Sequence, residues 1–262
     1  MAAPTDTTVL GDLHIRKDAE GVISLSGELA ELLVQARSGY AWRASSSTSQ
    51  QRIIDLERDT HERIESLNDE KAHWIIQQVS RWGGNRGSAS PKIDHASPAE
   101  KREFAGLIQA LLSPRSFEKA LSGLSAKPGL DLVIATKVYR FCWPEGGAAV
   151  DRHSSYFFNS LDLMDADGKR TKCCQFRRQW DGKRTRAGPT SRLAIYDPGG
   201  RGRDANLREY AHCYLPLLSA VAASLNGLGL TFTCAATGAK KGWRSADIEM
   251  AAYQWWSRNG PR

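Results

Sequence analysis

Residues 117–158 constrain the fold most strongly, because their local signals fix an ordered series of helices and turns. Residues 117–124 have a helical pattern, residues 127–129 read Lys-Pro-Gly, and a second helix is expected from about Leu132 to Cys142. After a glycine-containing loop, Asp151 stands at the start of a third helix. The pattern predicts a helix, a tight hairpin, a helix, a loop and an aspartate-capped helix. Such a hairpin presents backbone N–H groups at a helix N-terminus, where phosphate binds well.

Most of the remaining chain also has helical periodicity. The expected helices lie at about 26–37, 50–67, 68–82, 97–112, 205–226 and 245–256. Residues 1–23 are interpreted as a loose N-terminal arm, and short strands are expected near Val22–Leu25 and Leu230–Cys234. Asp181-Gly182 predicts a two-residue hairpin turn within a basic β insertion at 160–204. We therefore predict a mostly α protein with a small β-hairpin insertion.

Positive charge is concentrated in one stretch of the chain. The formal net charge is +7, and twelve basic residues stand against three acidic ones between Lys169 and Arg208. Such a field favours a polyanionic partner, because Lys and Arg displace condensed counterions from phosphates. A solvated basic loop in an otherwise ordinary protein is the alternative interpretation.

Several classes of protein do not fit the composition. No run reaches the roughly 18 apolar residues of a membrane span, and the first ten residues lack the pattern of a secretory signal. Five cysteines, an odd number, favour a reducing compartment over a disulfide framework. Cys173-Cys174 lacks the Cys-x-x-Cys spacing of zinc and iron–sulfur sites. We expect a cytoplasmic protein without membrane contact, and no metal or cofactor other than a monovalent cation at the hairpin.

Two short segments carry a family resemblance. Lys127-Pro128-Gly129-Leu130 and Val150-Asp151-Arg152-His153 resemble the two halves of the signature of helix-hairpin-helix DNA glycosylases. Within that superfamily they are most similar to proteins of the 8-oxoguanine DNA glycosylase fold, as are residues 242–251 and the apolar helix at Tyr214-Leu215. The resemblance implies a helix-hairpin-helix fold in which residues 1–262 form one glycosylase unit. It also implies a monomer with double-stranded DNA as its partner.

The resemblance makes Asp151 the candidate catalytic residue. Excision of a base leaves positive charge on the sugar, and a neighbouring carboxylate can stabilise that charge and activate water. Capping of the helix that begins near Ser154 is a second role for Asp151, compatible with the first.

The chain departs from the family pattern at two hairpin positions. Asp131 replaces the second glycine; Asp tolerates a left-handed backbone better than most residues, but it brings negative charge to a phosphate site. Val133 occupies the position of the catalytic lysine of bifunctional members, and Lys137 lies one helical turn later. Lys137 either reaches the pocket as a second catalytic residue or is a surface residue. Without it the enzyme is monofunctional, whereas with it a Schiff base and strand cleavage become available.

The remaining candidate residues would contact DNA or the flipped base. The base pocket is expected to use aromatic side chains, for which we select Trp82, Phe157 and Trp243; an alternative place for each is the core. Asn85 and Arg86 belong either to a loop that enters the duplex or to a plain connector. The predicted DNA contacts are Lys127, Gly129, Leu130, Asp131, Leu132, Val133, Asn85, Arg86, Arg177, Arg178, Lys183 and Arg184.

Three functions remain open from the sequence. The chain resembles anti-phage DNA glycosylases of this fold, of the bacteriophage replication inhibition type, which excise glucosylated hydroxymethylcytosine from modified phage DNA. Repair of 8-oxoguanine or another damaged base is the alternative within base excision. A non-enzymatic helix-hairpin-helix module that clamps DNA is the second class of function, and an RNA-processing protein is the third.

Overall fold

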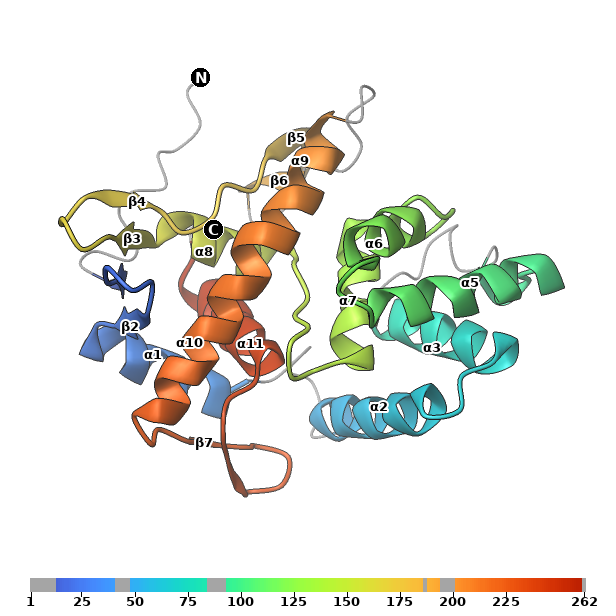
Figure 1. The fold of residues 1–262 in the computed structure, drawn as a ribbon, viewed down its shortest axis with the longest axis horizontal. Helices are drawn as coiled ribbons and strands as arrows, with labels where there is room; N and C mark the ends of the chain where they lie inside the picture. Colours follow the sequence, from blue (N-terminus) through green and yellow to red (C-terminus); the bar gives the residue numbers. More distant parts are fainter. Residues whose placement is uncertain (1–12, 41–47, 84–92, 186–187, 194–200, 261–262) are drawn as a thin grey trace. The chain divides into compact units, whose positions relative to one another are not determined.

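The computed structural model describes residues 13–40, 48–83, 93–185, 188–193 and 201–260 (Figure 1). In these ranges the chain is mostly helical with a small amount of sheet, which confirms the coarse fold class. The contacts fall into two compact units. The central unit is Arg43–Val150, and the terminal unit combines Met1–Trp42 with Asp151–Arg262. The sequence patterns did not indicate this division.

In the described part of the central unit the regular structure is entirely helical, and turns and loops join the helices. Its helices are α2 (Thr48–Ile64), α3 (Asp69–Trp82), α5 (Pro98–Leu111), α6 (Phe117–Ser125) and α7 (Leu132–Cys142). Helix α3 packs against α2, α5 and α7, and α6 packs against α5 and α7. The fully buried side chains that join these helices include Ile75, Ile76, Val79, Ile108, Leu121, Leu124 and Val138.

Helix ends in the central unit follow the capping signals of the sequence. Asn68 Oδ1 accepts a hydrogen bond from the Lys71 N–H at 2.9 Å and begins α3. Ser97 and Glu100 form a complete capping box at the start of α5, with Pro98 in the first turn. Gly83 ends α3, and its N–H donates to the Val79 carbonyl at 2.7 Å. These boundaries confirm the predicted ones, because caps satisfy backbone groups that a helix end leaves unpaired.

The terminal unit contains a four-stranded sheet with the order β2-β1-β3-β4. Strand β1 (His14–Lys17) is antiparallel to β2 (Ile23–Leu25) and parallel to β3 (Asp162–Met164), which is antiparallel to β4 (Arg170–Lys172). Two further hairpins are β5 (Arg178–Thr185) with β6 (Gly188–Leu193), and β7 (Phe232–Thr233) with β8 (Lys240–Lys241). Strand β1 therefore joins the N-terminal segment to residues about 150 positions later in the chain.

Helix α11 (Ser245–Asn259) is the centre of the helical part of the terminal unit. It packs against α1 (Gly27–Ser38), α8 (Arg152–Ser160) and α10 (Leu215–Gly227). Ahead of α10, helix α9 (Arg201–Glu209) continues into a π-helix, η1 (Tyr210–Tyr214), as Figure 1 shows in orange. None of the helices in the described ranges has the length and apolar character that crossing a membrane requires.

Three sequence expectations for the terminal unit need correction. The N-terminal arm of residues 1–23 is not loose throughout, because His14–Lys17 is an inner strand of the sheet. The helix expected at 205–226 begins at Arg201 and contains the π-helix. The hairpin turn is not at Asp181-Gly182: these residues lie within β5, where the register shifts between Trp180 and Arg184. Glycine inside a strand favours such a bulge, and the strands connect through 186–187, outside the described residues.

A buried ion pair joins the two ends of the terminal unit. Arg37 of α1 donates from Nε to Asp247 Oδ1 at 2.9 Å, and Arg244 Nε donates to Asp247 Oδ2 at 2.8 Å. The Arg37 guanidinium also lies over the Phe232 ring, 4.3 Å from its centroid. Burial, the largest influence, would raise the pKa of Asp247, but the charges and hydrogen bonds of Arg37 and Arg244 together lower it. Each oxygen of the Asp247 carboxylate therefore accepts a hydrogen bond from an arginine, and a buried charge requires such partners.

Asp247→Asn is expected to destabilise the protein by about 3–5 kcal/mol, because it leaves the buried Arg37 charge without its counterion. Chemical denaturation at neutral pH measures the loss. Asp162→Asn, which removes the half-buried partner of the exposed Lys172, is the control and should change stability by less than about 1 kcal/mol.

The pH dependence of this ion pair has a definite sign. Because the pKa of Asp247 is lowered in the folded protein, the pair stabilises the fold above the pKa of the unfolded carboxyl. That contribution is lost as pH falls through the folded pKa. In the denaturation experiment, equal losses of unfolding free energy in Asp247→Asn and Asp162→Asn would contradict the central role given to the Arg37–Asp247 pair.

Candidate active site at the start of helix α8

Asp151 is the N-cap of α8, as the sequence predicted. Its Oδ1 accepts hydrogen bonds from the N–H groups of His153 at 2.8 Å and Ser154 at 3.0 Å. The Ser154 hydroxyl donates to the same oxygen at 3.3 Å and accepts from the Asp151 N–H at 3.0 Å. Asp151 is half-buried, and none of the described residues donates a hydrogen bond to its Oδ2. The cap therefore orients the carboxylate through one oxygen and leaves the other available.

His153 lies beside this carboxylate. Burial lowers its pKa, the charges of Arg152 and Arg178 lower it further, and Asp151 acts in the opposite direction. The His153 ring packs edge-on against Tyr253, with 5.0 Å between ring centroids. The lowered pKa favours the neutral form of the imidazole beside Asp151.

Arg178 approaches the same helix from the start of β5. Its guanidinium lies over the Tyr156 ring, 3.2 Å from the centroid, and donates to Ser155 Oγ at 3.0 Å. Tyr156 in turn stacks on Trp256 with 5.6 Å between centroids and an interplanar angle of 4°. This stack places a positive charge on the surface of α8, so Arg178 has a structural role besides its predicted DNA contact.

The chain before β5 is held in place by polar side chains of two helices. Asn159 of α8 exchanges hydrogen bonds with the Phe176 backbone, and Asn206 of α9 does the same with the Arg177 backbone. Such paired amide contacts replace a missing neighbouring strand. The Arg177 side chain itself is exposed, as a DNA contact requires.

In the central unit, residues 127–129 form the tight turn between α6 and α7. The Leu130 N–H donates to the Lys127 carbonyl at 2.9 Å, and Gly129 has φ +84°, a left-handed conformation that favours glycine. Leu130 and Leu132 are buried in the core, so only their backbones can meet DNA. Val133 is half-buried. The chain thus forms a helix, a turn and a helix here, in the order that the sequence pattern predicted.

Asp131 does not adopt the left-handed conformation that we considered for it. It has φ −80° and ψ 177° and is the N-cap of α7, where its Oδ1 accepts from the Ile134 N–H at 2.9 Å. The reason is its place one residue before the helix, where an extended Asp is a favoured cap. An internal carboxylate therefore occupies part of the site at which this hairpin would bind phosphate.

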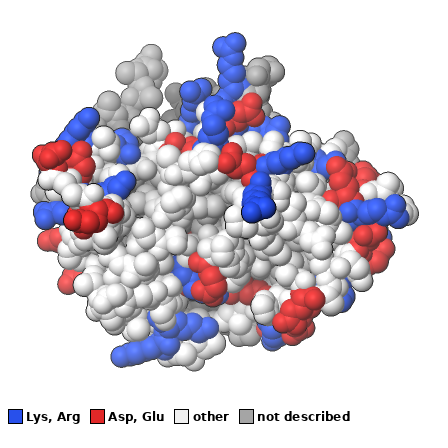
Figure 2. All heavy atoms as spheres, viewed as in Figure 1, with Lys and Arg blue, Asp and Glu red and all other residues white. Residues whose placement is uncertain are grey.

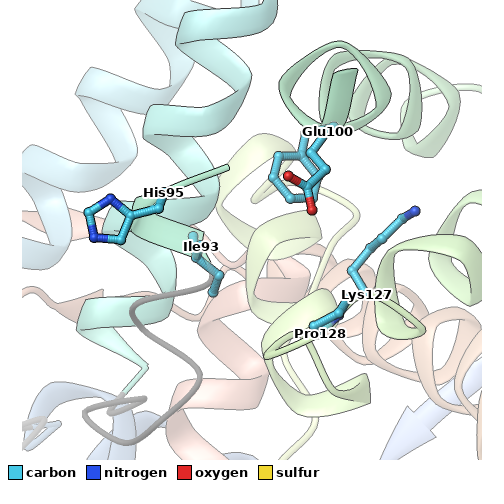
Figure 3. Close-up of a pocket in the computed structure, with 6 residues that line it drawn as sticks. Ile93, His95, Glu100, Lys127 and Pro128 are labelled. Carbon is cyan, nitrogen blue, oxygen red and sulfur yellow. The ribbon is translucent and has the colours of Figure 1, made fainter. Parts of the chain in front are cut away.

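Lys127 lies at a cavity beside the hairpin. The cavity has a volume of about 250 Å³ and is lined by Ile93, His95, Glu100, Phe104, Lys127 and Pro128 (Figure 3). Lys127 pairs with Glu103, and Glu100 places a carboxylate at the same rim. Among the described residues that line it, the rim thus has no excess of positive charge with which to hold a phosphate.

Lys137 is buried rather than on the surface. Its side chain lies in α7 with Nζ 3.3 Å from the Gly83 carbonyl, to which it donates, and 5.6 Å from the centroid of the Trp82 ring. Trp82 packs edge-on against Phe141 at 4.9 Å. The surface alternative for Lys137 is therefore wrong, and its amine is hydrogen-bonded to the end of α3.

The other two predicted pocket residues lie in the core of the terminal unit. Phe157 is fully buried against Phe158 and Trp255. Trp243 is 4% exposed, and its backbone exchanges hydrogen bonds with the Asn226 side chain. This packing favours the core alternative for both rings.

Some predicted residues cannot be placed. Asn85 and Arg86 lie outside the described residues, as do the side chains of Lys183 and Arg184. In the described ranges, no three His, Cys, Asp or Glu side chains gather as a metal site would need. No protein-family model, curated protein or solved structure matches the chain.

The surroundings of Asp151 include residues that sequence reasoning missed. Ser154, Tyr214 and Glu249 are all buried, and burial followed by the Glu249 charge raises the pKa of Tyr214 well above its ordinary value. A π-helix has no clear sequence signal. The acidic residue within the apolar run Ile248-Glu249-Met250 was a signal that could have been used, because charged side chains are seldom buried.

Asp151→Asn is expected to leave the stability within about 0.5 kcal/mol, because Asn is as good an N-cap as Asp, whereas Asp151→Ala should cost about 1 kcal/mol. Urea unfolding of the two variants checks this difference. If Asn were as costly as Ala, the charge rather than the cap hydrogen bonds would be what stabilises α8.

Proposed function

We propose that this protein is a DNA glycosylase of the helix-hairpin-helix class, with Asp151 as the residue that drives base excision. One observation carries the proposal: Oδ1 of Asp151 is fixed by three donors, while Oδ2 receives no hydrogen bond from the described residues. An oriented carboxylate with an available oxygen suits the stabilisation of a cationic sugar and the activation of water. The same chain segment carries the resemblance to this class of enzymes.

DNA binding is assigned to the hairpin and to the basic stretch of the terminal unit. The turn at 127–129 precedes α7, whose N-terminal amides and dipole favour an anion. Lys and Arg side chains lie at the upper edge of the view in Figure 2, where Figure 1 shows β5 and α9. In α9, Arg201 and Arg208 are exposed. Because Asp131 already caps α7, we assign most of the phosphate binding to the basic stretch.

The chemistry is proposed to stop at an abasic site with an intact strand. Val133 replaces the lysine of bifunctional members, and the Lys137 amine donates to the Gly83 carbonyl. A lysine held by such a hydrogen bond must break it before its amine can act as a nucleophile. These observations support a monofunctional enzyme, in which Lys137 positions the end of α3.

We propose glucosylated hydroxymethylcytosine of phage DNA as the substrate base, and hence a role in anti-phage defence. The departures at Asp131 and Val133 and the long basic insertion suit a specialist more than a general repair enzyme. Excision of 8-oxoguanine is the alternative, because it is what the 8-oxoguanine DNA glycosylase resemblance implies. The predicted monovalent cation at the hairpin and the monomeric state remain predictions.

A passive DNA-binding module is the second candidate function. It is favoured by one observation, namely that the N-cap contacts of Asp151 give this residue a complete structural role. The two functions differ in what Asp151→Asn does, since a passive clamp would bind DNA equally well without the charge.

The first test is base release from a panel of DNAs. Plain DNA and DNAs with 8-oxoguanine, uracil, hydroxymethylcytosine or glucosylated hydroxymethylcytosine are incubated with the wild type and with Asp151→Asn, and released bases are identified by mass spectrometry. The proposal predicts release from the glucosylated DNA, reduced at least about a hundredfold in the variant. Release from 8-oxoguanine would establish repair, and tight binding by both proteins without any release would establish the passive clamp.

Asp131→Asn tests the account of the hairpin. Asn keeps the cap of α7 while the negative charge is removed, so DNA affinity should rise severalfold at low salt and the gain should shrink at high salt. Fluorescence anisotropy with a duplex oligonucleotide at two salt concentrations measures this, with Glu118→Gln, on the neighbouring helix, as the control. An unchanged affinity would mean that the hairpin does not lie near DNA.

A further inference from the structure

Two asparagine side chains bind the backbone of the segment that leads into β5. Asn206 of α9 is fully buried; its Oδ1 accepts from the Arg177 N–H at 2.7 Å, and its Nδ2 donates to the Arg177 carbonyl at 3.0 Å. Asn159 of α8 makes the same pair of bonds with Phe176, at 3.1 and 3.0 Å. An amide bonded in this way uses a donor and an acceptor at once, so it fixes the peptide groups on both sides of one residue. We call Asn159 and Asn206 the amide clamps.

Successive side chains of the clamped segment point to opposite sides, as in a strand. Phe176 is buried, and its ring centroid lies 5.5 Å from that of Tyr214, whereas Gln175 and Arg177 are exposed. The Gln175 N–H donates to Glu209 Oε1 at 2.8 Å. Three consecutive residues are therefore anchored through their backbones, while the Arg177 side chain extends into solvent.

The Arg177 guanidinium carries a charge that no other described residue neutralises. No hydrogen bond or ion pair joins this side chain to another residue in the described ranges. Arg203 lies one helical turn before Asn206 and so on the same side of α9, half-buried. Both arginines belong to the stretch in which twelve basic residues stand against three acidic ones. A fixed guanidinium on such a surface suits a phosphate, which it can bind with two parallel hydrogen bonds.

The clamped segment ends beside the helix that Asp151 caps. Arg178 lies over the Tyr156 ring and donates to Ser155 Oγ at 3.0 Å. The Ser155 hydroxyl in turn donates to the Asp151 carbonyl. Because residues 151 and 155 are one helical turn apart, a DNA strand bound along this segment would pass close to Asp151.

We propose that residues 175–178 form a preorganised phosphate site, in which the amide clamps hold the backbone and Arg177 binds one phosphate of the DNA strand. The inference rests on the DNA binding of the proposed function. It makes Asn159 and Asn206 positioning residues, since they carry no charge and act through the backbone that they hold. The folded protein has already restricted the backbone of Arg177, so binding loses less conformational freedom.

Fluorescence anisotropy with a plain duplex oligonucleotide at several salt concentrations tests the phosphate contact. Arg177→Gln should weaken binding and make the plot of log Kd against log salt concentration less steep by about 1, as the loss of one phosphate contact predicts. An unchanged slope in Arg177→Gln would overturn the contact.

The clamps are tested by variants that remove no charge. Asn206→Ala should weaken DNA binding about threefold to tenfold, because the Arg177 backbone must then be ordered on binding. Asn159→Ala should act in the same direction, and it replaces Asn206→Ala if that variant folds poorly, since Asn159 is only half-buried. Wild-type affinity in a folded clamp variant would overturn the positioning role.

Asn226→Ala is the matched control. The Asn226 amide makes the same two bonds with another residue, accepting from the Trp243 N–H at 2.8 Å and donating to the Trp243 carbonyl at 2.9 Å, outside the basic stretch. This variant should leave DNA affinity within about twofold of wild type, because it disturbs none of the proposed phosphate contacts. Equal losses of affinity in Asn206→Ala and Asn226→Ala would overturn the proposal, because they would reflect a general loss of packing.

A double-mutant cycle tests whether the clamp acts through Arg177. Asn206→Ala should cause no further loss of affinity in the Arg177→Gln background. Losses that multiply would overturn this route, because a merely structural role of Asn206 would persist without the arginine.

These binding measurements need no base release, so they separate failure of the inference from failure of the proposed function. Base release by a protein whose clamp variants bind DNA as the wild type does would reject the inference and keep the glycosylase. The predicted losses of affinity in a protein that releases no base would support the inference and reject the glycosylase. A wild type that does not bind DNA would overturn both.

Discussion

The buried carboxylate of Asp247 is the interaction on which the terminal unit depends most. It binds Arg37 of the first helix and Arg244 at the start of the last helix, so it closes a chain separation of 210 residues. A misplaced partner would leave a charge in the core, which makes the pairing specific as well as stabilising. Closing this pair brings α11 against α1 and against α8, the helix that Asp151 caps. The orientation of the candidate catalytic residue thus depends on contacts made far away in the sequence.

Local sequence signals predicted most of the helices, because a capping side chain satisfies the unpaired backbone groups at the helix end beside it. Ser97 with Glu100 and Asn68 mark helix starts by chemistry that acts within three residues. The strand His14–Lys17 was not predicted, because its partner β3 lies almost 150 residues later and pairing decides its conformation. Asp181-Gly182 was misread for a related reason: the same dipeptide suits a turn and a bulge, and strand register chooses between them.

The candidate site was predictable only where it is local. Asp151 was identified by a family resemblance and by its capping position, and its cap is present. The aromatic residues were chosen by type, and the burial of Phe157 and Trp243 shows why that choice is weak, since ring packing uses the same residues as base stacking. The buried position of Tyr214 was not predicted, because the widened helical turn that contains it depends on tertiary packing. Residue type indicates which chemistry is available, and packing decides which side chains can perform it.

The account depends on chemistry at Asp151, and a single-turnover experiment tests this most directly. Saturating protein is mixed with duplex DNA carrying glucosylated hydroxymethylcytosine, and abasic sites are quantified over time for the wild type and Asp151→Asn, with the binding constant measured in parallel. The account predicts abasic sites with the wild type and a loss of at least about a hundredfold in the variant, at unchanged affinity and stability. Equal rates in the two proteins, or binding by the wild type without abasic sites, would contradict it.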